Sequence, residues 1–289
     1  MTHDVKATTD IVIDLSVADP ADVARIGGKA AGLAELIRGG FDVPRGVVIT
    51  AGGVDARFDE NSATLDSVVD RVVEALGNGP FAVRSSAVGE DSLDGSFAGI
   101  FETVLGVTGR ADLSDAIVAC LSSRDSLRAT AYGGGEAGPM AVVVQELVDA
   151  DTAGVAFAAD PVTGERDRTI VSAVRGLGER LVSGDVTPDE WEVKNGVVSV
   201  RTEGERALTE DQVLEVADLT NRITSHFREI PQDIEWAYAG GQLRSLQSRP
   251  ITGLPDVDPL EPTIDPPEDG FWSVDGGHYP RPVSPMAAS

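Results

Sequence analysis

Residues 81–103 read FAVRSSAVGEDSLDGSFAGIFET, and this stretch decides how the rest of the chain is interpreted. Its first three residues are apolar and predict a short buried strand, whereas Arg84 begins a segment rich in Ser, Gly and acidic residues. We therefore expect Arg84 to stand at a strand end and to face an anion. Its planar guanidinium can hold two phosphate oxygens at once, and the hydroxyl and amide groups of the segment can add further donors.

The glycines of the same segment predict a loop that binds phosphate. Gly99 lets the backbone approach a ligand closely, and Thr103 can place a hydroxyl against a phosphate or its metal. The other interpretation is an acidic surface loop in which Arg84 pairs with Glu90 or Asp91. The spacing does not match the G-x-x-x-x-G-K-[ST] phosphate loop, so these residues alone leave both interpretations open.

The composition of the chain restricts its partners. The 289 residues carry a formal net charge of −25, which disfavours nucleic acid and anionic membrane surfaces. No run approaches the roughly 20 apolar residues of a membrane-spanning helix, and the N-terminus lacks the pattern of a secretion signal. The single cysteine, Cys120, excludes an internal disulfide. We expect a cytoplasmic protein that binds neither nucleic acid nor membrane.

Lys29 belongs to a second candidate anion site. Only three of the 23 basic residues are lysines, and Lys29 follows Gly27 and Gly28 at the expected entrance of a helix. Free backbone amides and the positive end of the helix dipole favour an anion at such a position. The alternative is a glycine-rich turn that carries a solvated lysine.

Residues 231–252, PQDIEWAYAGGQLRSLQSRPIT, predict a β-hairpin around the Gly-Gly pair. If the loop has three residues, Glu235 stands opposite Gln247 and on the same face as Arg249. The other face would then hold Ile234, Trp236 and Leu246. A carboxylate beside an amide oxygen suits Mg²⁺, and the arginine can hold phosphates that the metal bridges. A two-residue loop would shift this pairing by one, and a surface salt bridge between Glu235 and Arg249 is the alternative.

The remaining pattern indicates a mixture of helices and strands. Apolar spacing predicts helices over 65–76, near 112–131 and within 208–230. From Met140 onward the chain predicts short strands, and Gln145 is a polar residue inside the apolar run 140–148. The last 36 residues are rich in proline and acids, which is the composition of an extended linker.

Several segments together resemble the ATP-binding domain of the phosphoenolpyruvate synthase and pyruvate phosphate dikinase family. In order, they are GGKAAGL, FAVRSSAVGEDSLDGSFAG, VVVQELV, GLGERLVSGDVTPDEW, PQDIEW and LQSRPIT. The PQDIEW and QSRPIT segments look nearest to the rifampicin phosphotransferase branch. The resemblance implies an α+β fold of the ATP-grasp type over residues 1–253, with ATP between subdomains at about 1–138 and 139–253. Residues 254–289 would be a linker and the start of a following domain.

The resemblance also implies a role for each candidate residue. Those expected to bind phosphate, and to catalyse by positioning and charge neutralisation, are Lys29, Arg84 and Arg249. Those expected to shape the loop above the phosphates are Gly99 and Thr103. Gln145 would lie beside the adenine and the hinge, and Glu235 and Gln247 would hold Mg²⁺.

The family's chemistry moves the β-phosphoryl group of ATP to a histidine on a swivelling domain, with AMP and phosphate as products. This sequence contains no T-x-H-type segment, so we expect a truncated or split dikinase whose phosphohistidine domain lies in another chain or in a missing C-terminal part. The final acceptor, whether pyruvate, a rifamycin-type drug or another compound, would depend on further domains. The alternatives are a non-catalytic nucleotide-binding or regulatory module, and an ATP-grasp ligase that forms an acyl phosphate and releases ADP.

Overall fold

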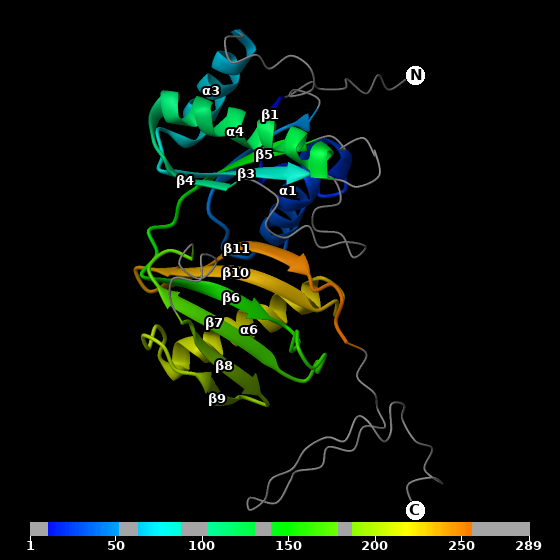
Figure 1. Ribbon diagram of the computed structural model, residues 1–289, viewed down its shortest axis with the longest axis vertical. Coiled ribbons are helices and arrows are strands. Elements are labelled where there is room, and N and C mark those ends of the chain that lie inside the picture. The colour runs from blue at the N-terminus through cyan, green and yellow to red at the C-terminus, as the bar shows by residue number, and fades with distance from the viewer. Residues whose placement is uncertain (1–10, 52–62, 88–102, 131–139, 179–186, 256–289) are drawn as a thin grey trace, which may run out of the picture.

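Two antiparallel β-sheets lie one above the other along the long axis of the molecule (Figure 1). This computed structural model describes residues 11–51, 63–87, 103–130, 140–178 and 187–255. Each sheet has its own helices and its own hydrophobic clusters, so the predicted α+β fold with two subdomains is confirmed. Within this described part, no helix combines the length and the apolar character needed to cross a membrane.

The first sheet has five strands in the order β1-β2-β5-β3-β4. They are β1 (Val12–Asp14), β2 (Gly46–Ile49), β3 (Phe81–Ala87), β4 (Thr103–Val107) and β5 (Met140–Glu146). Helices α3 (Ala63–Leu76) and α4 (Gly109–Thr130) pack on one face, where their apolar stripes bury Phe81 and Val83. Helix α1 (Val23–Arg38) packs on the opposite face against Val48 and Val143.

The position of β5 corrects the predicted division of the chain. The apolar run 140–148 does form a central strand, but β5 pairs with β2 and β3 in the first sheet. The expected boundary at 138–139 would separate β5 from the sheet to which it belongs. The two sheets instead divide between Glu146 and Thr152.

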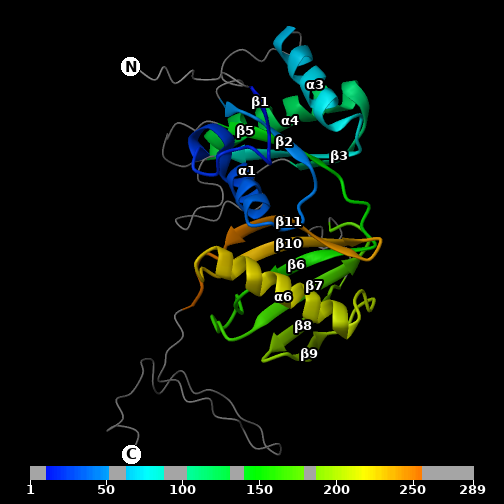
Figure 2. The ribbon, with the colours of Figure 1, turned by 180° about the vertical axis from the view of Figure 1, so that it is seen from behind.

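The second sheet has six strands in the order β11-β10-β6-β7-β8-β9. They are β6 (Thr152–Phe157), β7 (Thr169–Arg175), β8 (Asp189–Lys194), β9 (Val197–Thr202), β10 (Gln232–Ala239) and β11 (Gln242–Pro250). Helix α6 (Glu210–His226) lies across one face (Figure 2). Thr209 and Gln212 form the capping box expected at its start, and Val213 and Val216 pack against Trp236.

In the hairpin β10–β11, Glu235 stands opposite Gln247 as predicted, but not because of a three-residue loop. Its loop contains only Gly240 and Gly241, because Ala239 is paired with Gln242. A bulge opposite the Glu235/Trp236 step leaves Leu246 as an extra residue and restores Glu235 to the position opposite Gln247. The bulge also corrects the prediction for Leu246, which packs near Ala237 rather than on the Trp236 face.

Helix α1 connects the two halves of the fold. It packs on the first sheet and also against β11, and both ribbon views show it between the two (Figures 1 and 2). The approach is close because a Cβ built on Gly32 would lie 3.1 Å from the Ser248 carbonyl oxygen. The start of α1, strand β3 and the β10–β11 hairpin therefore meet in one region.

Candidate nucleotide-binding site

Lys29 lies just after a break in α1. The helix begins at Val23, earlier than predicted, but Gly27 has φ 77° and ψ 170° and interrupts it. Gly28 and Lys29 thus start a second helical segment, which agrees with the prediction that they stand at a helix entrance. Only 8% of Lys29 is exposed, so the alternative interpretation, a solvated lysine in a turn, is wrong.

Arg84 stands in the middle of β3 rather than at a strand end. The strand continues to Ala87, and β3 places Arg84 opposite Thr103 on β4, so these two predicted residues are neighbours. The side chain of Arg84 is 12% exposed and its Nη2 donates to Glu235 Oε2 at 2.9 Å. The Nε of Arg84 is buried and has no hydrogen-bond partner among the described residues. Glu90, the partner in the alternative interpretation, lies outside those residues, as do Asp91 and Gly99.

Glu235 and Gln247 form the predicted oxygen pair. They are directly opposite each other on β10 and β11. Gln247 is 4% exposed, and its buried Oε1 has no hydrogen-bond partner in the described part of the chain. A buried acceptor without a partner destabilises a fold by the cost of its desolvation, so this oxygen is free to accept from or coordinate a ligand.

The pKa of Glu235 is lowered from its usual range. Burial by itself would raise the pKa, but the charge of Arg84 and its hydrogen bond outweigh burial, and the charges of Arg249 and Lys29 act in the same direction. Glu235 is therefore an ionised carboxylate at neutral pH. These cations belong to neighbouring elements, because α1 packs against both β3 and β11 and Arg84 of β3 donates to Glu235.

Arg249 is held by Asp233, a residue that the sequence interpretation did not single out. Both Nε and Nη2 of Arg249 lie 2.8 Å from Asp233 Oδ2, and the two residues are directly opposite each other. The alternative interpretation, a surface salt bridge between Arg249 and Glu235, is not the pairing observed: Arg249 pairs with Asp233, and Glu235 pairs with Arg84. The signal for Asp233 was available, because it is two residues from Glu235 and shares its face of the hairpin.

Gln145 lies near the site but contacts a different partner. It is buried on β5 directly opposite Ala82, so it shares the sheet face of Arg84 two residues further along β3. Its Nε2 donates to the Pro44 carbonyl oxygen at 3.2 Å. It is the second-last residue of β5, beside the segment that leads into the second sheet. Its predicted role beside an adenine remains a prediction.

A small apolar surface lies next to Glu235 and Gln247. Val148, Ala153 and Ala237 form a buried cluster against which Leu246 packs. The bulge places Leu246 in this cluster. A polar end and an apolar end thus follow one another along the same strands, which suits a ligand with a charged group at one end and a flat apolar group at the other.

The oxygens of the site fit Mg²⁺ as part of a shared coordination shell. Among the described residues, no group of three or more His, Cys, Asp or Glu side chains gathers as a metal site. Mg²⁺ commonly takes one or two protein oxygens and completes its shell with water and substrate phosphates. The Glu235 carboxylate and the unpartnered Oε1 of Gln247 supply such a pair.

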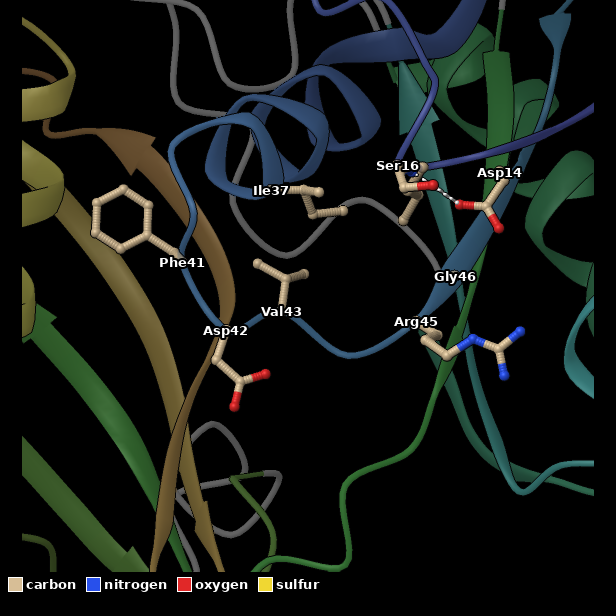
Figure 3. A pocket seen from close by; sticks show the side chains of 9 residues that line it. Asp14, Ser16, Ile37, Phe41, Asp42, Val43, Arg45 and Gly46 are labelled. Carbon is tan, nitrogen blue, oxygen red and sulfur yellow. Dashed lines mark hydrogen bonds between the residues drawn. The ribbon is translucent and has the colours of Figure 1, made fainter.

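A separate pocket of about 240 Å³ lies between the ends of β1 and α1 and the segment 41–46 (Figure 3). Asp14 lines it and accepts a hydrogen bond from Ser16, and Asp42 and Arg45 lie along its rim. None of the eight predicted site residues lines this pocket. It is therefore distinct from the cluster around Glu235.

A known protein family matches the part of the chain that contains this cluster's strands. The family described as "Pyruvate phosphate dikinase, AMP/ATP-binding domain" matches residues 60–204 and 192–263, which together are more than half of the chain. The chain belongs to this family. The match includes Arg84, Gln145 and the whole β10–β11 hairpin.

Curated relatives of this family align over most of the chain. A rifampicin phosphotransferase from a Streptomyces species is 34% identical over 313 aligned residues, covering 84% of this chain and 36% of the relative. A probable phosphoenolpyruvate synthase from Methanothermobacter thermautotrophicus is 32% identical over 307, covering 81% and 45%. The chain thus spans less than half the length of these relatives, which are larger proteins.

Solved structures with a similar course of the chain have little sequence identity. A D-alanine–D-alanine ligase from Helicobacter pylori has a TM-score of 0.45 and 11% identity, and the match covers 77% of this chain and 53% of that one. An N5-carboxyaminoimidazole synthetase from Staphylococcus aureus in complex with ADP has a TM-score of 0.40 and 14% identity, with 76% and 43% covered.

Proposed function

We propose that this chain is the Mg·ATP-binding module of a dikinase and that it supports transfer of the β-phosphoryl group of ATP to a histidine on a separate swivelling domain. The observation that carries the proposal is that Arg84 of the first sheet donates to Glu235 of the second, while α1, which carries Lys29, packs against the strand that carries Gln247 and Arg249. The family match supports the nucleotide, because it is to an AMP/ATP-binding domain.

The triphosphate would lie between the start of α1, strand β3 and the hairpin. Lys29 and Arg84 come from the first sheet and its helix, and Arg249 comes from the second sheet, so a polyphosphate would be held from two sides as in an ATP-grasp arrangement. Guanidinium and ammonium groups stabilise the negative charge that develops on phosphoryl oxygens. With no nucleophile assigned to this chain, its contribution is positioning and charge neutralisation.

The base would lie toward the connection between the sheets. The apolar cluster of Val148, Ala153 and Leu246 adjoins Glu235 along the strands, and Gln145 stands at the end of β5 just before this connection. An apolar surface with a few polar groups is the usual composition of a nucleotide-base site. Gln145 would then orient the base, as the family resemblance implies.

Mg²⁺ would be held by Glu235 and Gln247 together with phosphate oxygens. When bound, the ion neutralises phosphate charge and aligns the phosphoryl groups. The carboxylate of Glu235 is bonded to Arg84 in this structure, so it would exchange this partner for the ion. Arg84 would at the same time exchange Glu235 for phosphate. We propose that nucleotide binding replaces one ion pair with these two interactions.

The activity of a whole dikinase would need domains beyond the portion of the relatives that aligns with this chain. The relatives named rifampicin phosphotransferase and phosphoenolpyruvate synthase are more than twice as long as the portion that aligns. A phosphohistidine domain is the expected partner, either on another chain or on a longer form of this one.

The experiment supplies this chain with Mg·ATP labelled at the β-phosphorus and with a phosphohistidine domain from a relative. We expect AMP, phosphate and label on the histidine, and no label when that histidine is replaced by alanine. Formation of ADP would contradict the dikinase assignment and support a ligase. Tight Mg·ATP binding without turnover, with a partner domain of proven competence, would support a binding module. Failure to bind Mg·ATP would contradict the proposal entirely.

A further inference from the structure

The hydroxyl of Ser86 occupies a break in the hydrogen-bond ladder of α1. In an unbroken helix the N–H of Ala30 donates to the carbonyl oxygen of Ile26, four residues earlier. Here Ser86 Oγ stands between them: it accepts from Ala30 N–H at 3.2 Å and donates to the Ile26 carbonyl oxygen at 2.9 Å. Ser86 belongs to β3 and is fully buried, so a side chain of the sheet completes the helix. Insertion of a side chain into the ladder is a recognised cause of a kink.

Gly27 makes this insertion sterically possible. A Cβ at this position would collide with both the carbonyl and the hydroxyl oxygens of Ser86. The positive φ of Gly27 is also strained for residues that carry a side chain. Gly27 and Ser86 therefore form an interlocked pair, in which the glycine opens the helix and the serine fixes the opening.

The interlocked pair fixes the location of Lys29. The break falls two residues before Lys29, and the hydrogen bond to Ala30 lies one residue after it. Lys29 is thus held between two points attached to β3. Ser86 is also two residues from Arg84 on the same strand, so both face α1. One strand then determines where two of the site's cations lie, Arg84 directly and Lys29 through the Ser86 hydroxyl.

We propose that Ser86 is a positioning residue that acts through Lys29. It holds the kinked start of α1 so that the ammonium group of Lys29 faces the phosphates of the nucleotide. This inference rests on the proposed function, because it assumes that Lys29 binds phosphate. Ser86 itself makes no contact with the nucleotide in this account.

The test is a double-mutant cycle between Ser86→Ala and Lys29→Met. Dissociation constants for Mg·ATP and for adenosine are measured by displacement of a fluorescent ATP analogue. We expect Ser86→Ala to weaken Mg·ATP binding about tenfold, because Lys29 is no longer held against the phosphates. Adenosine affinity should change less than about twofold. In the Lys29→Met background, Ser86→Ala should weaken Mg·ATP binding by less than about twofold, since the residue through which it acts is absent.

Two further variants separate positioning from general loss of stability. Thr220→Val removes another fully buried hydroxyl, which donates to the Val216 carbonyl within α6. We expect its thermal unfolding temperature to fall without a change in Mg·ATP affinity. Ser86→Cys keeps most of the side-chain volume with a weaker hydrogen-bonding group, and its affinity should lie between those of the wild type and Ser86→Ala. It also provides the measurement if Ser86→Ala fails to fold.

The outcomes distinguish this inference from the proposed function. Equal losses from Ser86→Ala in the presence and absence of Lys29, or equal losses for Mg·ATP and adenosine, would overturn the inference alone. Unchanged Mg·ATP binding by folded Ser86→Ala and Ser86→Cys would do the same. A wild-type chain that binds no Mg·ATP would overturn the proposed function and this inference together.

Discussion

Arg84 and Arg249 are both arginines on strands beside the same carboxylate, but they are held in different ways. Arg249 pairs with Asp233, which is opposite it on the same hairpin, so the pair follows from local strand register. Arg84 pairs with Glu235, which is 151 residues away on the other sheet. The first pair keeps its geometry whenever the hairpin forms. The second pair depends on how the two sheets meet, which is the arrangement that a nucleotide between them would alter.

The comparison indicates that the two sheets contribute different groups to the proposed nucleotide site. The second sheet supplies an oxygen pair and an arginine whose charge is already partly neutralised by Asp233. The first sheet supplies Arg84, and its helix α1 supplies Lys29, whose charge also acts on Glu235. We infer that the contribution of the first sheet to phosphate binding is the larger one.

The largest expected effect follows from removing Arg84. We expect Arg84→Met to weaken Mg·ATP binding about a hundredfold, because it removes the proposed phosphate ligand and leaves the Glu235 carboxylate without its close partner. Titration calorimetry measures the change. Arg222→Met, at an exposed arginine of α6 that pairs with Asp218, is the matched control and should leave affinity unchanged. A loss below about threefold for Arg84→Met would break the proposed contrast between the sheets.

An ion pair in the second half of the fold, away from the proposed site, should affect stability but not Mg·ATP affinity. Asp160 has 2% of its side chain exposed and accepts from Arg201 at 2.6 Å. Burial would raise the pKa of Asp160, but the bonds from Arg201 and from the amides of Val162 and Thr163 outweigh burial and lower it. We expect Asp160→Asn to reduce the free energy of unfolding by about 2 kcal/mol at pH 7. Mg·ATP affinity should stay the same.

The effect of Asp160 should also depend on pH in a defined direction. Because the folded-state pKa is lowered, the carboxylate stabilises the fold above its unfolded pKa of about 3.9, and this contribution disappears as the pH falls through the folded value. Urea unfolding of the wild type and of Asp160→Asn at pH 7 and at about pH 3 measures it. A difference between the two proteins that grows as the pH falls would contradict this account.

Replacement of Gln247 should have a smaller effect, in which Mg·ATP affinity falls while stability stays the same or rises. Gln247→Met replaces the unpartnered Oε1 with an apolar group of similar size, so the protein without ligand should be as stable or more stable by about 1 kcal/mol. Mg·ATP affinity should fall about tenfold, while the affinity for ATP in EDTA should stay within about twofold. Calorimetry with and without Mg²⁺, together with thermal unfolding, gives both readouts. Loss of stability without loss of Mg²⁺ dependence would show that Gln247 is structural.

The parts of the fold that depend on local pattern could be predicted from the sequence. The stripe and capping box of α6 were readable because neighbours in a helix are three and four residues apart. The pairing of Glu235 with Gln247 was also predicted, but from a loop one residue too long. The bulge at Leu246 compensated for this error, and nothing in the residues QLRSLQSRP of β11 marks a bulge.

The parts that depend on contacts between distant segments could not be predicted in the same way. The apolar run of β5 indicated a central strand, but nothing in its residues shows which sheet it joins. The run of serines after Arg84 suggested a loop, because sequence patterns do not reveal that the Ser86 hydroxyl completes a helix 60 residues earlier. Asp233 is different: its spacing from Glu235 was visible, and its role was missed.

The most direct test of the central claim is whether one bound nucleotide contacts both sheets. Mn²⁺·ATP is added to the isotopically labelled protein in place of Mg·ATP, and paramagnetic broadening of backbone amide signals is recorded by NMR. The account predicts broadening at Lys29 and Arg84 of the first half and at Glu235 and Gln247 of the second, with Val200 of β9, at the opposite edge of the second sheet, unaffected. Broadening confined to one sheet would contradict it.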